Sequence, residues 1–340
     1  FGGNIGRNTA PYLIASYYDS SLVDGMAGSV NTPPNKDIRW EKTTTVNVGV
    51  DFALFRHRLS GTIEYYNKYS VDLLAAINGS PTQGFGYTTL MTNNGKMVNR
   101  GVEITLSGEI IRQKDFSWNA SLLYAFNRNK VKHISVQPSL WDSRISMPTS
   151  YPMVGKPLYG IYAYKWAGLN ENGDPQVYDA ENNVTSGPAR DYHALVYCGT
   201  TVPIHNASLT NVLRYKGFEF SAMLILDAGH KLRSSNIPSI NMSNGRITST
   251  AKGIVDRWTQ PGDVTDVPRL LFSNDTENFN THRTELYRYS DLFVYDASNI
   301  RLSNISLAYR VPAHWCKKIS LSGARLQFNV ENVATFAFDS

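Results

Sequence analysis

Long apolar runs are missing from this sequence of 340 residues. The stretches Leu73–Ile77 and Ala222–Leu226 reach only five residues, whereas a membrane-spanning helix needs about 20. Helical spans are therefore excluded. A membrane β-barrel is not excluded, because its strands need only about 9–11 residues of alternating polarity.

Charge is also scarce. The formal net charge is +5, only 18% of the residues are charged, and no block of Lys or Arg stands out. Soluble domains typically contain about a quarter of charged residues, and nucleic-acid-binding proteins gather basic residues into a patch. We therefore expect no nucleic-acid partner.

Catalytic motifs are absent as well. The seven histidines are scattered without metal-ligand spacing, and the sequence has no HExxH, no GxSxG and no phosphate-binding loop. The oxygen-rich stretch Asn170–Asp174 lacks the spacing of a calcium loop, so we interpret it as an Asn-Gly turn. We expect no enzymatic activity and no cofactor.

The two ends of the sequence lack the marks of a complete protein. The first residues, FGGNIGRNTAPY, have neither the basic nor the apolar region of a signal peptide. The last residues, NVATFAFDS, stop within strand-like sequence. We expect the chain to continue at both ends and Phe1–Asn4 to be the stub of a further strand.

What the sequence has in abundance is alternation with a period of two residues. In TTTVNVGVDF (Thr43–Phe52), one parity is mostly apolar and the other is polar or glycine. This pattern predicts a β-strand with one apolar and one polar face. The apolar parity, which we expect to face lipid, comprises Thr44, Val46, Val48, Val50 and Phe52.

Seven further segments share this pattern and pair with the first strand into four hairpins. They are Leu59–Tyr69, Val98–Ile110, Phe116–Asn127, Leu209–Arg214, Glu219–Leu226, Ile300–Val311 and Leu321–Ala334. Within Ile300–Tyr309 the apolar parity changes phase, which predicts a β-bulge.

The connections alternate between short and long. The four within hairpins are short: Phe55–Arg58, Arg112–Asp115, Tyr215–Phe218 and Pro312–Lys318. The three between hairpins are long: about Ala75–Met97, Lys130–Ala207 and Asp227–Asn299. This sorting is typical of a transmembrane β-barrel with short turns in the periplasm and long loops outside the cell.

Aromatic residues favour the same interpretation, because they gather near the two ends of the predicted strands, as the girdles of a barrel do. The alternative is that aromatics simply prefer strands. Near the long loops lie Tyr65, Tyr69, Tyr124 and Phe126, and near the short turns lie Phe52, Phe116, Trp118, Phe218, Phe220 and Tyr309.

The middle long loop contains strand-like parts between Lys156 and Asp179, which we interpret as an extracellular β-elaboration. This topology separates the two cysteines, since Cys198 falls in an outer loop and Cys316 in an inner turn. A hydrocarbon core of about 30 Å would lie between them, whereas a disulfide needs Cα atoms within about 7 Å. We predict two free cysteines.

Nine stretches follow one another in order along almost the whole chain. The first is IRWEKTTTVNVGVDF. The others are LSGTIEYYNKYSVDLL, NNGKMVNRGVEITL, FSWNASLLYAFNRNKV, VGKPLYGIYAYKWAGL, PIHNASLTNVLRYKGFEFS, DRWTQPGDVTDVPRL, ASNIRLSNISLAYRVP and LQFNVENVATF. Together they resemble the SusC/RagA family of TonB-dependent outer-membrane transporters.

The resemblance implies an all-β fold, an antiparallel transmembrane barrel of about 22 strands closed by a plug domain. Residues 1–340 would be its C-terminal part, without the plug, the N-terminal strands and the final strands. It also implies TonB-dependent import of oligosaccharides or peptides across the outer membrane of a Gram-negative cell. The implied partners are a SusD-like surface lipoprotein, the TonB complex and outer-membrane lipid.

Two groups of residues are candidates for binding. On the polar strand faces, the residues expected to line the lumen are Glu64, Tyr66, Glu103, Asn119, Arg325, Gln327 and Asn329. In the last long loop, Trp258, Asp263 and Arg269 either meet the lipoprotein or substrate, or only pack the loop itself. A passive porin, a surface adhesin and a soluble secreted β-protein are the alternatives to energised import.

Overall fold

A computed structural model describes residues 14–19, 25–32, 35–78, 89–135, 143–187, 191–242, 251–272, 281–318 and 320–338. The expected stub at Phe1–Asn4 lies outside them. Within this part of the chain, no helix combines the length and the apolar character needed to cross a bilayer.

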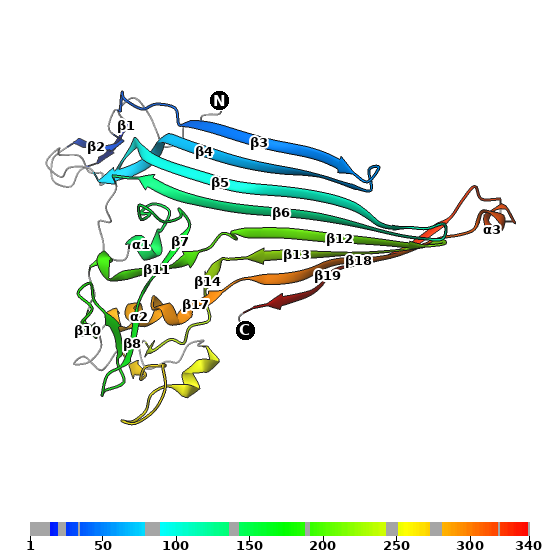
Figure 1. Cartoon of the computed structure of the whole chain (residues 1–340). Coiled ribbons are helices and arrows are strands. Elements are labelled where there is room, and N and C mark those ends of the chain that lie inside the picture. Colours follow the sequence, from blue (N-terminus) through cyan, green and yellow to red (C-terminus); the bar gives the residue numbers. More distant parts are fainter. Residues whose placement is uncertain are drawn as a thin grey trace.

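One eight-stranded antiparallel sheet dominates the structure (Figure 1). Its strand order, β19-β18-β13-β12-β6-β5-β4-β3, keeps the four predicted hairpins intact and side by side. The strands are β3 (Lys42–Leu54), β4 (Leu59–Asn78), β5 (Thr89–Arg112), β6 (Phe116–His133), β12 (His205–Tyr215), β13 (Phe218–Ala228), β18 (Asn299–Arg310) and β19 (Arg325–Ala337). The all-β barrel fold is confirmed as a curved wall that is not closed within this chain.

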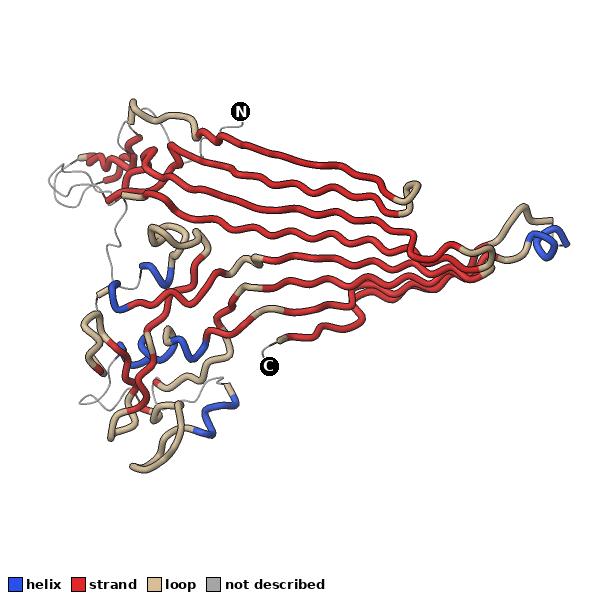
Figure 2. Tube along the Cα trace, in the orientation of Figure 1, coloured by secondary structure: helices blue, strands red, loops and turns tan. Residues whose placement is uncertain are grey.

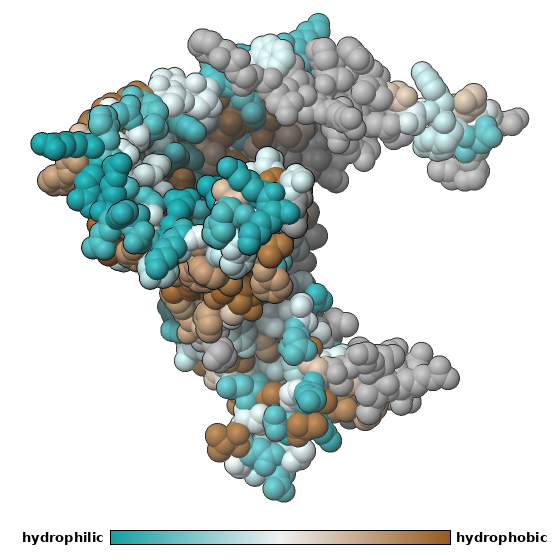
Figure 3. Space-filling model, turned by 90° about the vertical axis from the view of Figure 1, so that its right-hand side faces the viewer, coloured by the Kyte–Doolittle hydropathy of each residue, from teal (hydrophilic) through white to brown (hydrophobic). Residues whose placement is uncertain are grey.

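The register sorts side chains into an apolar and a polar face. Val48 lies opposite Tyr65, Tyr65 opposite Val102, and Val102 opposite Phe126, so apolar residues continue from strand to strand. Val48 and Val50 are each 61% exposed, as expected for side chains that would contact lipid in a membrane. Viewed along the strands, the molecule forms an arc that is open on one side (Figure 3).

Two bulges explain where the period of two breaks down. Ser303 is the extra residue in β18, because Met223 pairs with Asn304 and the next residue of β13, Leu224, pairs with Leu302. This is the predicted bulge. A second one in β4 holds Asp72 at φ 55°, and pairing with β5 resumes beyond it up to Asn78. The expected long loop Ala75–Met97 is therefore wrong, since strand occupies both of its ends.

The short turns lie at the opposite end of the sheet. Between β3 and β4, Phe55, Arg56 and His57 all have positive φ, between 54° and 66°. The last connection is longer than predicted: Pro312 precedes a helix, α3 (Ala313–Lys318), and β19 begins at Arg325 rather than Leu321. Proline is well tolerated at the start of a helix, because the backbone N–H that it lacks would have no hydrogen-bond partner within the helix there.

The long loops fold into a separate assembly at the other end, where most helix also lies (Figure 2). The predicted elaboration is confirmed: its strands form small sheets outside the main one. The assembly and its neighbouring hairpin comprise β1 (Ile14–Asp19), β2 (Met26–Thr32), α1 (Ser143–Ser146), β7 (Gly160–Tyr164), β8 (Trp166–Leu169), β9 (Pro175–Tyr178), β10 (Val184–Thr185), β11 (Leu195–Thr200), β14 (Lys231–Arg233), β15 (Asn241–Met242), β16 (Leu271–Phe272), α2 (Thr281–Arg288) and β17 (Val294–Asp296). Three single turns of 3-10 helix accompany them at Tyr192–Ala194, Lys252–Asp256 and Asp291–Phe293.

The hydrophobic cores of the molecule lie in this loop assembly rather than on the sheet. One core joins β7, β9, β11 and α2 around Tyr162, Tyr164 and Leu286. The other holds Ile240 and Tyr287, whose ring meets Phe293 edge to face at 4.9 Å. Burial raises the pKa of the Tyr287 hydroxyl. Loops with cores of their own act as a folded body rather than as loose connections.

The cysteines occupy opposite ends of the molecule, as predicted. Cys198 lies in β11 of the loop assembly and Cys316 in α3 beyond the short turns (Figure 1). Both are free thiols.

Candidate functional site

All seven lumen candidates lie on the polar face of the sheet. Strand alternation places them there, because each has the parity opposite to the exposed valines of β3 or to the apolar residues paired with them. The structure places six of them in two groups on different strands, and the seventh, Asn119, belongs to neither group. No catalytic arrangement is evident in them.

The first group is Glu64, Tyr66 and Glu103 on β4 and β5. Glu64 lies directly opposite Glu103, and Asn47 Nδ2 donates a hydrogen bond to Glu64 Oε2 at 3.4 Å. Tyr66 lies over Gly101, since a Cβ at that glycine would overlap the phenol oxygen. The group combines an aromatic ring with two neighbouring carboxylates on the hollow side of the wall.

The second group surrounds Glu219 near the short turns. Glu219 accepts hydrogen bonds from Arg214 Nε at 2.7 Å and from Arg325 at 3.0 Å. Gln327 Nε2 donates to Ser306 Oγ at 3.3 Å and to Asn329 Oδ1 at 2.9 Å. Sequence reasoning found Arg325, Gln327 and Asn329 but missed Glu219 and Arg214. Arg214 and Glu219 directly flank the Tyr215–Phe218 turn, so pairing of the two strands across that turn would have placed them opposite each other.

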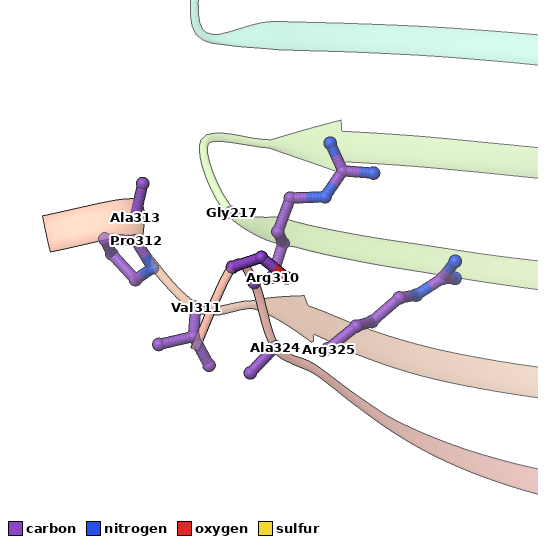
Figure 4. A pocket seen from close by; sticks show the side chains of 9 residues that line it. Gly217, Arg310, Val311, Pro312, Ala313, Ala324 and Arg325 are labelled. Atoms are coloured by element: carbon purple, nitrogen blue, oxygen red, sulfur yellow. The ribbon is translucent and has the colours of Figure 1, made fainter. Parts of the chain in front are cut away.

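Two cavities adjoin this second group. The smaller, about 140 Å³, lies beside Glu219 and its arginines. The larger, about 610 Å³, opens at the turn between β18 and β19; the Arg325 side chain extends from it along the strands, and the Arg310 side chain crosses over the hairpin that contains Gly217 (Figure 4). Its lining comprises Gly217, Arg310, Val311, Pro312, Ala313, Ser322, Gly323, Ala324 and Arg325.

Asn119 belongs to neither group. It lies opposite Glu109 on β5 and Val212 on β12. The structure therefore gives it a place on the polar face but no neighbouring candidate.

The loop candidates Trp258 and Asp263 are held within the loop assembly. The Trp258 ring lies against Gly173, where an added Cβ would overlap it, and its backbone N–H donates to Val267 O at 2.8 Å. Asp263 Oδ2 accepts hydrogen bonds from the backbone N–H groups of Thr259 and Gln260 at 2.8 and 3.0 Å. These bonds, first that from Thr259, lower the pKa of the Asp263 carboxyl.

Arg269 belongs to an ion network centred on Asp174. Its guanidinium forks onto the carboxylate, with Nε 3.0 Å from Oδ1 and the terminal nitrogen 2.8 Å from Oδ2. Arg283 of α2 adds a bond to Oδ1 at 3.1 Å and donates to the carbonyl oxygens of Ile240 and Arg269 at 3.0 and 2.7 Å. The network therefore ties the turn after β8 to β16 and α2.

Asp174 and Arg283 escaped prediction as partners because 109 residues separate them. The turn Asn170–Asp174 itself is confirmed: Gly173 has φ 74°, and Asn170 Oδ1 accepts from the N–H groups of Asn172 and Asp174 at 2.9 and 2.8 Å. Among the residues that the structure describes, no group of three or more His, Cys, Asp or Glu is placed to hold a metal ion.

Comparison with known proteins identifies relatives over nearly the whole chain. A family model described as TonB dependent receptor-like, beta-barrel matches residues 2–333. TonB-dependent receptor P3 of Formosa agariphila is 25% identical over 320 residues, covering 89% of this chain and 30% of the relative. TonB-dependent receptor SusC of Bacteroides thetaiotaomicron is 25% identical over 312 residues, covering 88% and 29%. The chain thus spans less than a third of these relatives.

Solved structures share the fold. A structure described as the RagAB peptide transporter superposes with a TM-score of 0.74 at 22% identity, over 96% of this chain and 35% of that one. The RagAB peptide importer in its open-open state gives the same TM-score over 98% of this chain.

The expected resemblance to SusC and RagA is therefore confirmed, in a family of outer-membrane transporters and receptors rather than of enzymes. The chain belongs to the TonB-dependent receptor family, and it forms part of the family's β-barrel.

Proposed function

We propose that this chain is part of the barrel of a SusC-like transporter, which imports oligosaccharides or peptides across the outer membrane with energy from TonB. The observation that carries the proposal is the combination of a lipid-type wall with a folded loop assembly at one end only. A polar hollow face beneath structured loops suits capture and passage of a bulky polar solute.

The remaining parts of the transporter lie outside residues 1–340 on this proposal. Strands β3 and β19 are the two edges of the sheet, and unpaired backbone groups are strongly unfavourable in hydrocarbon. We infer that further strands pair with both edges and that a plug domain fills the space beside the polar face.

A SusD-like lipoprotein is the proposed partner at the long-loop end. The segment that contains Trp258, Asp263 and Arg269 belongs to the folded assembly there, so it offers a partner a preformed surface. Preformed surfaces bind without the entropic cost of ordering a loop.

Glu64, Tyr66 and Glu103 are the proposed contacts for substrate on the way through. An aromatic ring stacks on sugars or on peptide side chains, and the carboxylates accept hydrogen bonds from sugar hydroxyls or peptide N–H groups. RagAB, whose fold the chain shares, is described as a peptide transporter. The chemistry of the group suits both substrate classes.

Uptake by cells that carry the full-length gene tests the proposal. Labelled oligosaccharides and labelled peptides are offered to cells with and without TonB, and we expect uptake of one class that is lost without TonB. Uptake that survives the deletion would indicate a passive porin, and binding without uptake would indicate an adhesin.

A matched pair of variants tests the lumen contact. Tyr66→Phe removes a hydroxyl from the polar face, and Tyr65→Phe removes one from the neighbouring residue on the apolar face. Loss of a hydrogen bond worth about 1 kcal/mol should lower the apparent substrate affinity roughly fivefold for Tyr66→Phe only. Equal effects of the two variants would refute a substrate contact at Tyr66.

A further inference from the structure

Three basic residues interrupt the apolar face of β5 and β6 at the long-loop end of the sheet. They are Arg100 on β5 and Arg128 and Lys130 on β6. Their parity is that of the lipid-type side chains, since Arg100 is two residues from Val102 on β5, and Arg128 and Lys130 are two and four residues from Phe126 on β6. They therefore project outward from the wall rather than into its hollow.

The rows of paired residues change character abruptly at this point. The outward rows Ile63–Ile104–Tyr124 and Tyr65–Val102–Phe126 are apolar or aromatic. The next row is Asn67–Arg100–Arg128, and the one beyond is Tyr69–Val98–Lys130. The basic residues thus begin directly above the row Tyr65–Val102–Phe126.

Their height matches the edge of a bilayer. Trp118, of the predicted girdle near the short turns, is ten residues before Arg128 on β6, or about 34 Å along a strand at about 3.4 Å per residue. A strand tilt of about 40° reduces this to roughly 26 Å, against an apolar band about 25 Å tall. Arg128 therefore stands at the level of lipid headgroups.

Within the described membrane-spanning parts of β3–β6, the three cations have no acidic partner on their own face. The register turns every Asp and Glu of the membrane-spanning parts of β3–β6, namely Asp51, Glu64, Glu103 and Glu109, to the other side. Arg100 donates from Nε to Asn67 Oδ1 at 3.2 Å, and it lies directly opposite Arg128. All three basic side chains are exposed.

Like charges directly opposite each other destabilise a sheet, and a shared anion removes that repulsion. Arginine forks match phosphate geometry, and Tyr69 beside Asn67 offers a ring and an amide of the kind that contact sugars. We propose that Arg100, Arg128 and Lys130 bind a phosphate group of a phosphorylated glycolipid in the outer leaflet.

This site is separate from transport, because it faces the bilayer and none of its residues lines the hollow. It rests on the orientation in which the long loops are extracellular. Bound lipid would hold the wall at a fixed height where β6 continues past the start of β12, since His205 pairs with Phe126 and β6 runs on to His133.

Lipid binding by the full-length protein in detergent micelles tests the proposal. The probe is a fluorescent lipid A that carries both phosphates, and folding of each variant is checked by its heat-dependent mobility on gels. We expect Arg100→Gln/Arg128→Gln to bind at least about tenfold more weakly than wild type, since charge-assisted contacts are lost. The single variant Lys130→Gln removes one charge rather than two, so it should weaken binding by a smaller factor.

Lys68→Gln is the matched control, because Lys68 pairs with Asn99 at the same height but on the hollow side. It should bind the probe as wild type does, and dephosphorylated lipid A should bind wild type as weakly as the double variant. Equal binding by double variant and wild type would overturn the proposal. So would an equal loss in Lys68→Gln, equal binding of phosphatidylglycerol vesicles, or displacement of the probe by inorganic phosphate at the probe's own concentration.

Discussion

Asp174→Asn should loosen the loop assembly while leaving the barrel wall folded. Asp174 accepts three charge-assisted hydrogen bonds from Arg269 and Arg283, and the Arg283 side chain is only 3% exposed. Such bonds are worth about 1.5–3 kcal/mol each, and removing one partner of a buried pair costs about 3–5 kcal/mol. Asparagine keeps one acceptor oxygen and Asp174 is partly exposed, so we expect about 3 kcal/mol.

Native-state hydrogen exchange measures this loss where it occurs. A loss of about 3 kcal/mol raises the open population of the assembly about a hundredfold, so amides of β9 and β16 should exchange about a hundredfold faster. Amides of β12 and β13 should not change. Asp179→Asn is the control, because Asp179 accepts its hydrogen bonds from Glu181 and Asn183 within its own turn. Unchanged exchange in Asp174→Asn would refute the view that this network holds the assembly together.

Three further predictions concern the wall and the pH response of the loops. Val48→Arg should destabilise insertion into vesicles by about 2–4 kcal/mol near the bilayer midplane, whereas Asn47→Arg on the polar face should insert normally; similar insertion of both would contradict the assigned facing. Gly101→Ala would place its Cβ against both the Tyr66 phenol and the Phe126 carbonyl oxygen and should lower the free energy of unfolding by about 1–3 kcal/mol, a loss that a smaller residue at Tyr66 should relieve only in part because the backbone contact stays. Hydrogen bonds and a nearby lysine lower the pKa of Asp296 from 3.8 to about 2, so its contribution to stability is complete above about pH 4 and disappears as the pH falls through 2. Asp296→Asn should abolish that part of the acid sensitivity of loop exchange, and an identical pH profile would exclude the carboxyl as its source.

The wall could be predicted from sequence because its rule is local. In a strand between lipid and lumen, successive side chains point to opposite faces. The alternation within Thr43–Phe52 was therefore enough to predict which of its side chains face lipid. Even the bulge at Ser303 left a trace, as a change of phase between Leu302 and Ile305. The rule failed at Asp72, because a positive φ in β4 resets the parity and hides the strand beyond it.

The loop assembly could not be predicted because its contacts join distant residues. Arg283 reaches Asp174 across 109 residues and Ile240 across 43, and neither distance leaves a periodic signal. α3 was missed for a different reason, since its six residues look like any polar turn. The lumen candidates were placed on the correct face by parity alone, which says nothing of what they contact.

The edges of the sheet have a consequence for how the molecule folds. β3 has 13 residues, and among the described strands β4 is its only neighbour in the sheet, so about six N–H and six C=O groups along it point away from the ladder. Each would cost several kcal/mol if left bare in hydrocarbon, and β19 presents a second such row. Insertion of these strands one after another would therefore pass through a prohibitive intermediate. For the proposed barrel we therefore expect membrane entry and ring closure to be coupled into one late cooperative step, so that strands far apart in the sequence acquire their stability together.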